Sequence, residues 1–279
     1  MSKAAERAIA QKYIGGVPWL MVAWGLGGFL LWLALWPLVA SGTLPLWAGF
    51  IIATIVLCYS YLPTHEAQHG NIGRPGSSTR WLNELVGHLS VLPVMIPYRL
   101  HRAVHLKHHA NANDPDKDPD YYMKADNVWG AIGKAIDVMQ PNRQGALAAR
   151  VLEDTPERAS MAMEGFLMTR AMWIVMAALA WSGFALEVLM LWWIPRKIAG
   201  VYLPVTLSWA PHHPMEKTGR YGETRAWKSP VGTLLTAGME YHLVHHLFPA
   251  IPLNKTPAAY RELRPLLAEQ GIDVDSLPA

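Results

Sequence analysis

The chain has 279 residues, of which 52% are hydrophobic and only 16% are charged, so it is more apolar than an ordinary soluble domain. Its formal net charge of +3 is too small to indicate a nucleic-acid partner. The single cysteine, Cys58, lies in an apolar run, which excludes a disulfide framework, a cysteine-based zinc site and a thiolate iron–sulfur cluster. The composition, which includes thirteen Trp and ten Tyr, favours a membrane protein.

The first part of the chain predicts a polar start followed by a helical hairpin. Residues 1–16 are polar and amphipathic, and no small-residue cleavage site follows closely, so we expect an uncleaved cytoplasmic segment. Val17 to Ala40 is apolar and longer than the roughly 20 residues that cross a hydrocarbon core. After a short turn comes a second apolar run, Leu46 to Leu62, so residues 17–62 are predicted to form a first membrane hairpin.

Residues 63–165 are predicted to form a cytoplasmic cap. The cap begins with His65 and His69, at the point where the second helix leaves the membrane. Trp81 to Leu100 is interrupted by polar residues and prolines, so we expect it to lie along the membrane interface rather than to cross it. Asn127 to Glu164 carries distributed basic residues, and the positive-inside rule places it on the cytoplasmic side.

Residues 166–209 predict a second membrane hairpin. Phe166 to Ser208 is apolar over a length that covers two crossings of about 20 residues each. An unpaired charge at the bilayer centre costs several kcal/mol, roughly 2.5 to 3.5 by insertion scales. We therefore expect the outer turn to lie close to Arg196 and Lys197 or to Glu187.

Residues 210–279 return to the cap and end in a soluble tail, with an amphipathic helix predicted over Thr256 to Gln270. We find no internal repeat. The sequence therefore predicts one domain over residues 1–279, an all-α integral membrane protein. It would have about four transmembrane helices in two hairpins, and a cytoplasmic helical cap that holds a histidine-rich site.

The stretch HRAVHLKHH at residues 101–109 contains no Gly, Pro or β-branched run and predicts a helix. In a helix His101, His105 and His109 lie four residues apart on one face, with His108 three residues beyond His105. Burying four imidazoles requires a partner for every ring nitrogen, and protonating them together is repulsive. Metal binding is the simplest interpretation.

All twelve histidines fall in two windows, residues 65–109 and 212–246. Two apolar passes precede each window, so both windows are predicted on the same side of the membrane, where they can form one site. The spacing is HxxxH once and HxxHH twice. Imidazole-rich sites suit iron, zinc or copper, and three such clusters offer too many ligands for one ion and suit two.

Two other functions also fit parts of this pattern. The stretch HEAQH at residues 65–69 matches HExxH, in which two histidines bind zinc and the glutamate is the general base of a metalloprotease. That interpretation leaves both HxxHH clusters without a role. A non-enzymatic membrane protein that binds or transports metal would place polar residues inside its spans, and these spans have few.

The acidic stretch after the four histidines invites a calcium interpretation, because Asp114, Asp116, Asp118 and Asp120 alternate along the chain. The stretch lacks the glycine and the terminal glutamate of a calcium loop. We expect these carboxylates, Asp114 and Asp118 in particular, to cap helices and to hydrogen-bond to histidine N–H groups.

The three clusters in this order, separated by apolar hairpins, resemble the membrane fatty acid desaturase superfamily over nearly the whole chain. The resemblance implies a di-iron centre without haem on the cytoplasmic face, which uses O2 and electrons to oxidise an unactivated C–H bond of a lipid. The metal ligands that the three clusters imply are His65, His69, His105, His108, His109, His242, His245 and His246. A further histidine often precedes the third cluster in this superfamily, so His212 is the ninth expected ligand.

The remaining histidines and one carboxylate are expected near the metals rather than on them. His213 is a further ligand candidate, and His88 and His101 are candidates for hydrogen bonding to the ligands. Glu66 stands where many members of the superfamily have Asp, which lengthens a carboxylate expected to support a ligand.

The chain carries no fused haem or ferredoxin module, so the resemblance implies an external electron donor such as ferredoxin, rubredoxin or cytochrome b5. Arg143, Arg150 and Arg158 could dock an acidic donor, although a solvated face is the simpler interpretation of each. Within the superfamily, VHLKHHANANDPDKDPDYY and YHLVHHLFPAIP are similar both to desaturase-like β-carotene hydroxylases and to bacterial acyl desaturases. The substrate, an acyl chain or a carotenoid, and the outcome, desaturation or hydroxylation, stay open at this point.

Overall fold

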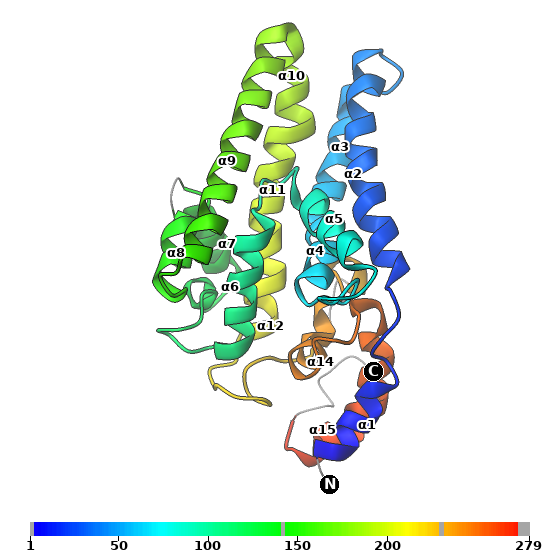
Figure 1. The fold of residues 1–279 in the computed structure, drawn as a ribbon, viewed down its shortest axis with the longest axis vertical. Coiled ribbons are helices and arrows are strands. Elements are labelled where there is room, and N and C mark those ends of the chain that lie inside the picture. Colours follow the sequence, from blue (N-terminus) through cyan, green and yellow to red (C-terminus); the bar gives the residue numbers. More distant parts are fainter. Residues whose placement is uncertain (1–2, 141–142, 229–231, 273–279) are drawn as a thin grey trace.

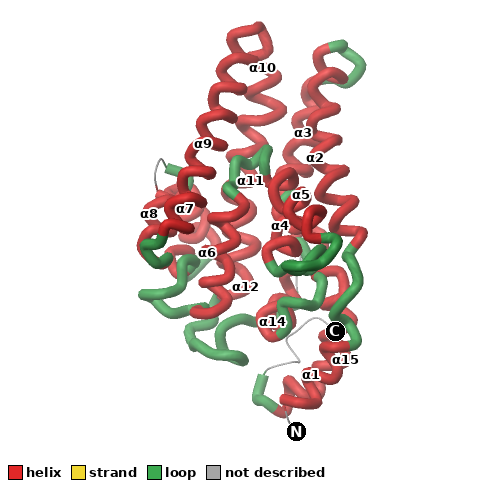
Figure 2. Tube along the Cα trace, viewed as in Figure 1, coloured by secondary structure: helices red, strands yellow, loops and turns green. Residues whose placement is uncertain are grey.

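The computed structural model describes residues 3–140, 143–228 and 232–272. Every regular element in these ranges is a helix, as the sequence predicts (Figure 2). Two helical hairpins rise side by side from a body of shorter helices (Figure 1).

The first hairpin contains α2 (Trp19–Ala40) and α3 (Leu46–Tyr59), and it turns where Gly42 adopts a φ of 74°. The helical path continues beyond α3 through Ser60 into α4 (Tyr61–Gln68). The predicted second helix is therefore longer than expected. His65 and Glu66 lie within it and are buried, instead of sitting where the helix emerges into water.

The second hairpin rises through α9 (Pro156–Leu179), whose N-terminus is capped by the Thr155 side chain. The chain reverses in the segment η2 (Ala180–Phe184), where Gly183 has a φ of 98° that favours glycine. The sequence predicted the outer turn near Arg196 and Lys197 or near Glu187. The observed turn at Gly183 lies near Glu187.

The returning arm of this hairpin alternates α-helical and π-helical segments. In order these are α10 (Ala185–Glu187), η3 (Val188–Trp193), α11 (Ile194–Leu203), η4 (Pro204–Trp209) and α12 (Ala210–His212). Proline lacks the N–H that the regular ladder needs, and Pro195 and Pro204 both lie on this arm.

Arg196 lies inside α11, well away from the outer turn. Its Nε donates a hydrogen bond to the Val94 carbonyl at 3.2 Å, and its guanidinium lies 6.0 Å from the ring centroids of Trp173 and Trp193. These contacts offset part of the cost of burying a cation.

Indole rings pack the two hairpins together. Trp192 packs edge to face on Trp32 and Trp36, with ring centroids 5.1 and 6.2 Å apart, and Trp32 Nε1 donates to the Leu191 carbonyl at 3.0 Å. The outer faces are apolar and exposed, with Trp181 93% accessible. Three helical segments, Trp19–Ala40, Leu46–Gln68 and Pro156–His212, are long and apolar enough to cross a membrane. Within the described residues, these three segments are therefore the candidate membrane spans, by length and composition.

Shorter helices surround the lower half of the hairpins. The segment predicted to lie along the interface forms α5 (Arg80–Val91) and the start of α6 (Tyr98–Asn111), and α5 packs against α4 and α2. Further along the chain come η1 (Tyr121–Met123), α7 (Val128–Val138) and α8 (Arg143–Val151).

In the described residues, the C-terminal part adds four more short elements and one longer helix. They are α13 (Gly232–Leu235), η5 (Met239–Tyr241), α14 (His242–Leu247), η6 (Leu253–Lys255) and α15 (Thr256–Glu269), which confirms the predicted tail helix. The N-terminal helix α1 (Lys3–Gln11) lies alongside α15 at the base of the molecule (Figure 1).

Candidate metal centre

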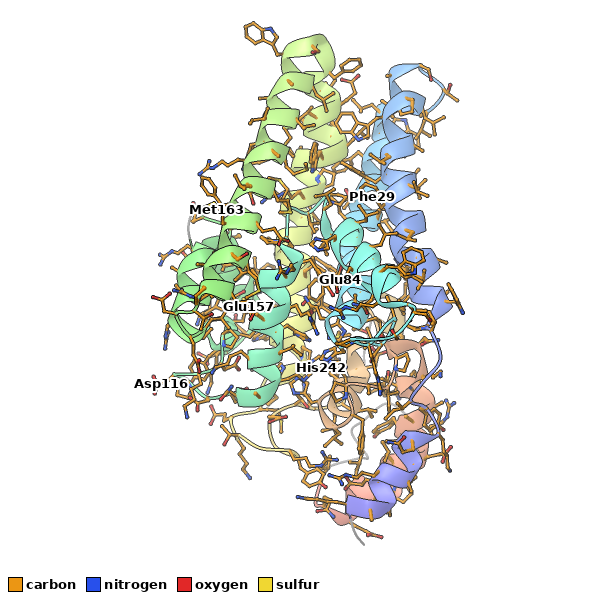
Figure 3. The ribbon with its side chains drawn as sticks, viewed as in Figure 1. Phe29, Glu84, Asp116, Glu157, Met163 and His242 are labelled. Carbon is orange, nitrogen blue, oxygen red and sulfur yellow. The ribbon has the colours of Figure 1, made fainter. Side chains whose placement is uncertain are left out.

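Nine histidines from four helical regions converge beneath the hairpins. They come from the end of α4, from α6, from α12 and from α14, which are far apart in the sequence. His242 lies in the interior between these helices, whereas Met163 and Asp116 project from the outside (Figure 3). Within the described residues, the side chains divide into two groups in which one nitrogen of every member lies within 4.8 Å of the others.

The first group combines five histidines from all three predicted clusters. Its closest contacts join Nε2 atoms: His69 to His105 at 2.9 Å, and His109 to His105 and to His245 at 3.2 and 3.0 Å. His65 completes the group, with its ring centroid 4.3 Å from that of His245. The members are His65, His69, His105, His109 and His245.

The second group contains the other four predicted ligands, His108, His212, His242 and His246. The Nε2 atoms of His108 and His212 are 3.2 Å apart. The two groups adjoin, because the rings of His109 and His246 stack with centroids 4.2 Å apart. The adjacent residues His108 and His109 point to different groups, because neighbouring side chains of a helix are about 100° apart.

The nitrogen contacts fit metal ligands better than a hydrogen-bonded cluster. A neutral imidazole has one donor and one acceptor nitrogen, but His105 Nε2 faces the Nε2 atoms of both His69 and His109. Nitrogens bound at about 2.1 Å to one ion and at right angles to each other lie about 3 Å apart. In addition, His246 Nε2 is buried without a partner, which costs about 1 to 3 kcal/mol unless an ion takes its lone pair.

Two carboxylates hold histidines of the second group. Asp118 lies 2.8 Å from His108 Nδ1, and both side chains are 3% exposed. Glu223 lies 3.3 Å from His246 Nδ1, and its backbone carbonyl accepts a hydrogen bond from His212 Nδ1 at 2.9 Å. Such contacts fix the ring orientation and leave Nε2 free to bind a metal.

Most of the buried imidazoles are neutral in both groups, since burial also lowers the pKa of His242 and His246 in the second group. Burial, followed by repulsion from neighbouring imidazoles, lowers the pKa of His105, His109 and His245, and burial lowers the pKa of His69 to about 3. These rings are therefore neutral at pH 7 and can bind a cation directly.

His108 behaves in the opposite way. Burial alone would lower its pKa, but the carboxylates of Asp120, Asp118 and Glu223 outweigh burial and raise it to about 9. The second group therefore carries a proton that a metal ion would have to displace.

The structure separates the remaining candidates from the two groups. His101 contacts the Tyr61 hydroxyl at 3.2 Å and Gln68 Nε2 at 3.3 Å. His88 lies edge to face on Tyr98, at 4.9 Å between centroids, and His213 stacks on Trp209 at 4.8 Å.

Neither of the other two acidic candidates contacts a histidine among the described residues. Asp114 accepts hydrogen bonds from the backbone N–H groups of Asp116 and Lys117, so it caps a turn at the surface. Glu66 accepts from the Asn71 side chain at 2.7 Å and from the Leu253 backbone N–H. Glu66 therefore links the first cluster to the C-terminal part of the chain.

Sequence reasoning missed Glu223. It lies in the charged loop between α12 and α13, twenty-three residues before His246 along the chain, and no spacing rule connects the two. Its only signal in the sequence is that it is an acid between two histidine clusters.

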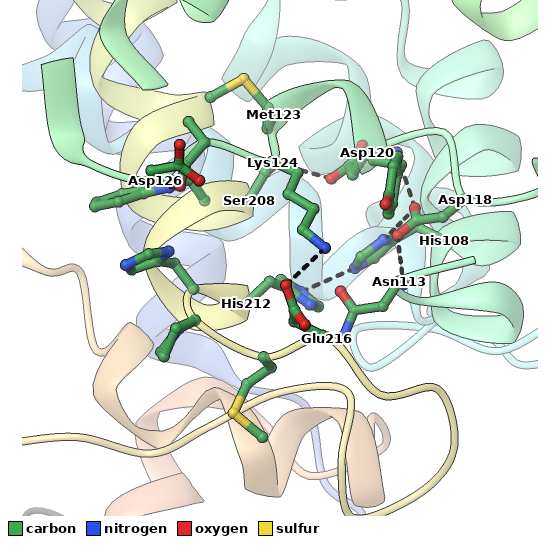
Figure 4. Close-up of a pocket in the computed structure, with 16 residues that line it drawn as sticks. His108, Asn113, Asp118, Asp120, Met123, Lys124, Asp126, Ser208, His212 and Glu216 are labelled. Carbon is green, nitrogen blue, oxygen red and sulfur yellow. Dashed lines mark hydrogen bonds and ion pairs between the residues drawn. The ribbon is translucent and has the colours of Figure 1, made fainter. Parts of the chain in front are cut away.

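A cavity of about 120 Å³ touches both histidine groups. His65 and His105 of the first group and His108 and His242 of the second line it. Apolar residues of the α5–α6 connection and of the returning arm form part of its wall, among them Val94, Met95, Ile96, Leu203 and Leu207. Polar side chains, including Asp120, Arg196 and Ser208, also line it. A second cavity of about 220 Å³ lies on the other side of His108, bordered by Asp118, Lys124 and Glu216 (Figure 4).

Apolar helices of membrane-spanning length lie above two adjacent histidine groups. The fold and the site therefore define a helical protein with candidate membrane spans and a candidate two-ion centre next to a partly apolar cavity. The family model described as fatty acid desaturase matches residues 41–278, so the chain belongs to the fatty acid desaturase family.

Several curated proteins are similar to this chain. The sn-2 acyl-lipid omega-3 desaturase (ferredoxin) of Arabidopsis thaliana chloroplasts is 23% identical over 84% of the chain, and the sn-1 acyl-lipid omega-3 desaturase (ferredoxin) of Synechocystis is 24% identical over 74%. An endoplasmic reticulum omega-3 fatty acid desaturase of Nicotiana tabacum is 22% identical over 74%. The chain spans 56%, 63% and 61% of the lengths of these relatives.

Proposed function

We propose that the protein is an oxidoreductase that desaturates an acyl chain of a membrane lipid at a di-iron centre. The observation that carries this proposal is the cavity in which two histidine groups meet a partly apolar wall. The family and the names of the relatives support an acyl substrate and an external electron supply. In the reaction two C–H bonds of adjacent carbons are lost, and O2 accepts two electrons and two protons from outside together with the substrate hydrogens, giving two water molecules.

The two histidine groups would each hold one iron ion, with five and four imidazoles respectively. Imidazole ligands suit iron, and the desaturase family supports iron over zinc or copper. Bound iron would supply the activation of O2 that no amino-acid side chain provides. The residues of this chain would supply the other parts of the mechanism, which are positioning of the substrate, exclusion of water and orientation of the histidines.

The protein would position the acyl chain and exclude water. Val94, Met95 and Ile96 lie on one side of the cavity and Leu203 and Leu207 on another, so an apolar chain can displace water while one pair of methylenes faces the histidines. Asp118 and Glu223 would keep the second group oriented while its charge changes.

We propose four membrane crossings, the two arms of each hairpin, with the histidine groups on the cytoplasmic side. The turns at Gly42 and Gly183 would then lie together on the opposite face, in agreement with the arrangement in Figure 1. The same arrangement of the hairpins supports our proposal of one domain over residues 1–279, organised as predicted from the sequence. Single-cysteine variants such as Gly42→Cys and Arg74→Cys, in a Cys58→Ala background, should react with an impermeant maleimide from opposite sides of sealed vesicles.

An external donor would deliver the electrons one at a time. Two of the relatives are named as ferredoxin-dependent, so a ferredoxin is the preferred donor, with rubredoxin or cytochrome b5 as alternatives. Arg143, Arg150 and Arg158 remain the proposed docking residues.

The placement of Glu66 argues against the metalloprotease alternative. In that mechanism the glutamate acts as general base on a metal-bound water, but here its carboxylate is held by Asn71 and the Leu253 backbone. The non-enzymatic alternative does not account for a cavity that joins both histidine groups to the apolar residues Val94, Met95 and Ile96.

Two measurements test the proposal. Purified protein should contain about two iron ions per chain, whereas one zinc ion would support the protease and overturn the di-iron centre. The protein should then be expressed with a ferredoxin system in one host analysed for acyl composition and in another that accumulates β-carotene. New double bonds in acyl lipids are the expected result. Hydroxylated carotenoid without acyl change would replace acyl desaturation by carotenoid hydroxylation.

A further inference from the structure

A buried carboxylate on the N-terminal helix lies at the start of a chain of contacts that ends at the second histidine group. Glu6 is 2% exposed, although most residues of α1 are exposed at the edge of the molecule. Ala10, one turn further on, is also buried and packs in a cluster with residues of α15. One face of α1 is thus docked, and Glu6 lies on it.

The partners of Glu6 are adjacent residues of the loop between α12 and α13. Arg220 Nη2 donates to Glu6 at 2.9 Å, and the Tyr221 hydroxyl donates to it at 2.6 Å. A buried carboxylate is tolerated only when such donors compensate for lost hydration, so the two contacts fix this part of the loop against α1.

The same loop reaches the histidines within a few residues. Glu223 is two residues beyond Tyr221, and it contacts His246 through its carboxylate and His212 through its carbonyl. Arg220 also lies 5.0 Å from the centroid of the Phe248 ring, at the end of the helix that carries His246. The loop is therefore held at one end by Glu6 and holds two histidines at the other.

We propose that Glu6 is a positioning residue for the second metal ion. By holding Arg220 and Tyr221 it fixes the loop so that Glu223 can orient His246 and His212 before the ion binds. The inference rests on the proposed di-iron centre and extends it to a residue of α1, outside the region that the family model matches.

The test measures iron retention rather than activity. Full-length protein in detergent is loaded with ferrous iron, and release to a chelator is followed in wild type, Glu6→Gln and Glu223→Gln. Supporting contacts of this kind typically change metal affinity by about 10- to 100-fold, so we expect Glu223→Gln to release one of two irons at least tenfold faster. Glu6→Gln should accelerate the same phase several-fold.

A matched control and a double variant separate positioning from general stability. Glu262→Gln loosens the segment directly after α1, because Glu262 on α15 pairs with Lys12 and Tyr13. Glu262 does not touch the loop, so this variant should release iron like wild type. The double variant Glu6→Gln/Glu223→Gln should be no faster than Glu223→Gln alone, because the two residues act through one path. If Glu6→Gln does not fold, Tyr221→Phe replaces it as the test variant. This change removes one hydrogen bond to Glu6 and keeps the aromatic ring.

The outcomes are distinct. Wild-type release from Glu6→Gln, or additive effects in the double variant, would overturn the positioning role and leave the di-iron centre standing. A wild-type protein that holds no iron would instead refute the proposed function.

Discussion

The two histidine groups lie side by side but are built differently. The first is made of neutral rings on α4, α6 and α14, and among the described residues no carboxylate hydrogen-bonds to any of its ring nitrogens. The second includes a histidine from the end of the second hairpin and is supported by Asp118 and Glu223. Two iron ions bound there would be inequivalent, with rigid helices positioning one and loop carboxylates supporting the other.

The comparison is tested most strongly by removing one ligand from each group. His245→Ala and His108→Ala should each abolish turnover, because two-electron chemistry on O2 needs both ions. The product is measured by mass spectrometry of lipids and iron is measured per chain. Each variant should keep about one iron, since the other group is complete.

His88→Ala provides the control for both variants. His88 packs on Tyr98 and contacts neither group, so the variant should retain substantial activity and both irons. Equal loss in all three variants would mean that the ligand set is larger than the nine histidines.

The supporting carboxylates should matter less than the ligands, and only for the second group. Asp118→Asn keeps the shape and removes the charge that holds His108, so iron affinity at one of two sites should fall about 10- to 100-fold. Asp114→Asn is the control, because Asp114 caps a surface turn and pairs with Lys117 but contacts no histidine among the described residues. Iron binding isotherms should show one weakened site; weakening of both would show that the groups are not independent.

The groups should also differ in the protons that they release. At pH 7.5 His108 is protonated, because its pKa is about 9, whereas the pKa values of His69 and its neighbours are lowered. Iron binding should therefore release about one proton at the second group and almost none at the first. Calorimetry in two buffers of different ionisation enthalpy measures this, and Asp118→Asn should reduce the release. Equal proton release at both sites would show that the two groups do not differ in protonation.

The sequence was sufficient to predict which histidines converge, because a periodic apolar pattern fixes the hairpins and the spacing within each cluster fixes a helix face. The division of the nine into five and four could not be predicted, since it depends on how α6 is rotated relative to α12 and α14. His108 and His109 are neighbours in the chain, yet they join different groups.

The surrounding polar contacts were harder to predict than the ligands. Asp118 was expected near a histidine because it follows the HxxHH cluster closely, and it does contact His108. Glu66 was expected to support a ligand but contacts Asn71 and Leu253 instead, because a helical residue directly after His65 points about 100° away from it. Glu223 lies in an irregular loop, where no periodicity carries information about direction.

The smallest expected effect concerns the side from which electrons enter. Arg150 donates a hydrogen bond to the Pro115 carbonyl at 2.9 Å, on the acidic loop that also carries Asp118, so a donor docked there would approach the second group. Arg150→Glu should raise the KM for reduced ferredoxin several-fold, and the difference from wild type should shrink at high salt, because exposed charges are screened over about 10 Å at 0.1 M.

Arg74→Glu is the matched reversal on the side of the first group. Arg74 is exposed in the loop that follows His69, so it should leave ferredoxin kinetics unchanged if electrons enter past the second group. Steady-state assays over a salt series measure both variants. A larger effect at Arg74 than at Arg150 would move the entry point to the first group, and it would imply that the ion bound by the neutral histidines is reduced first.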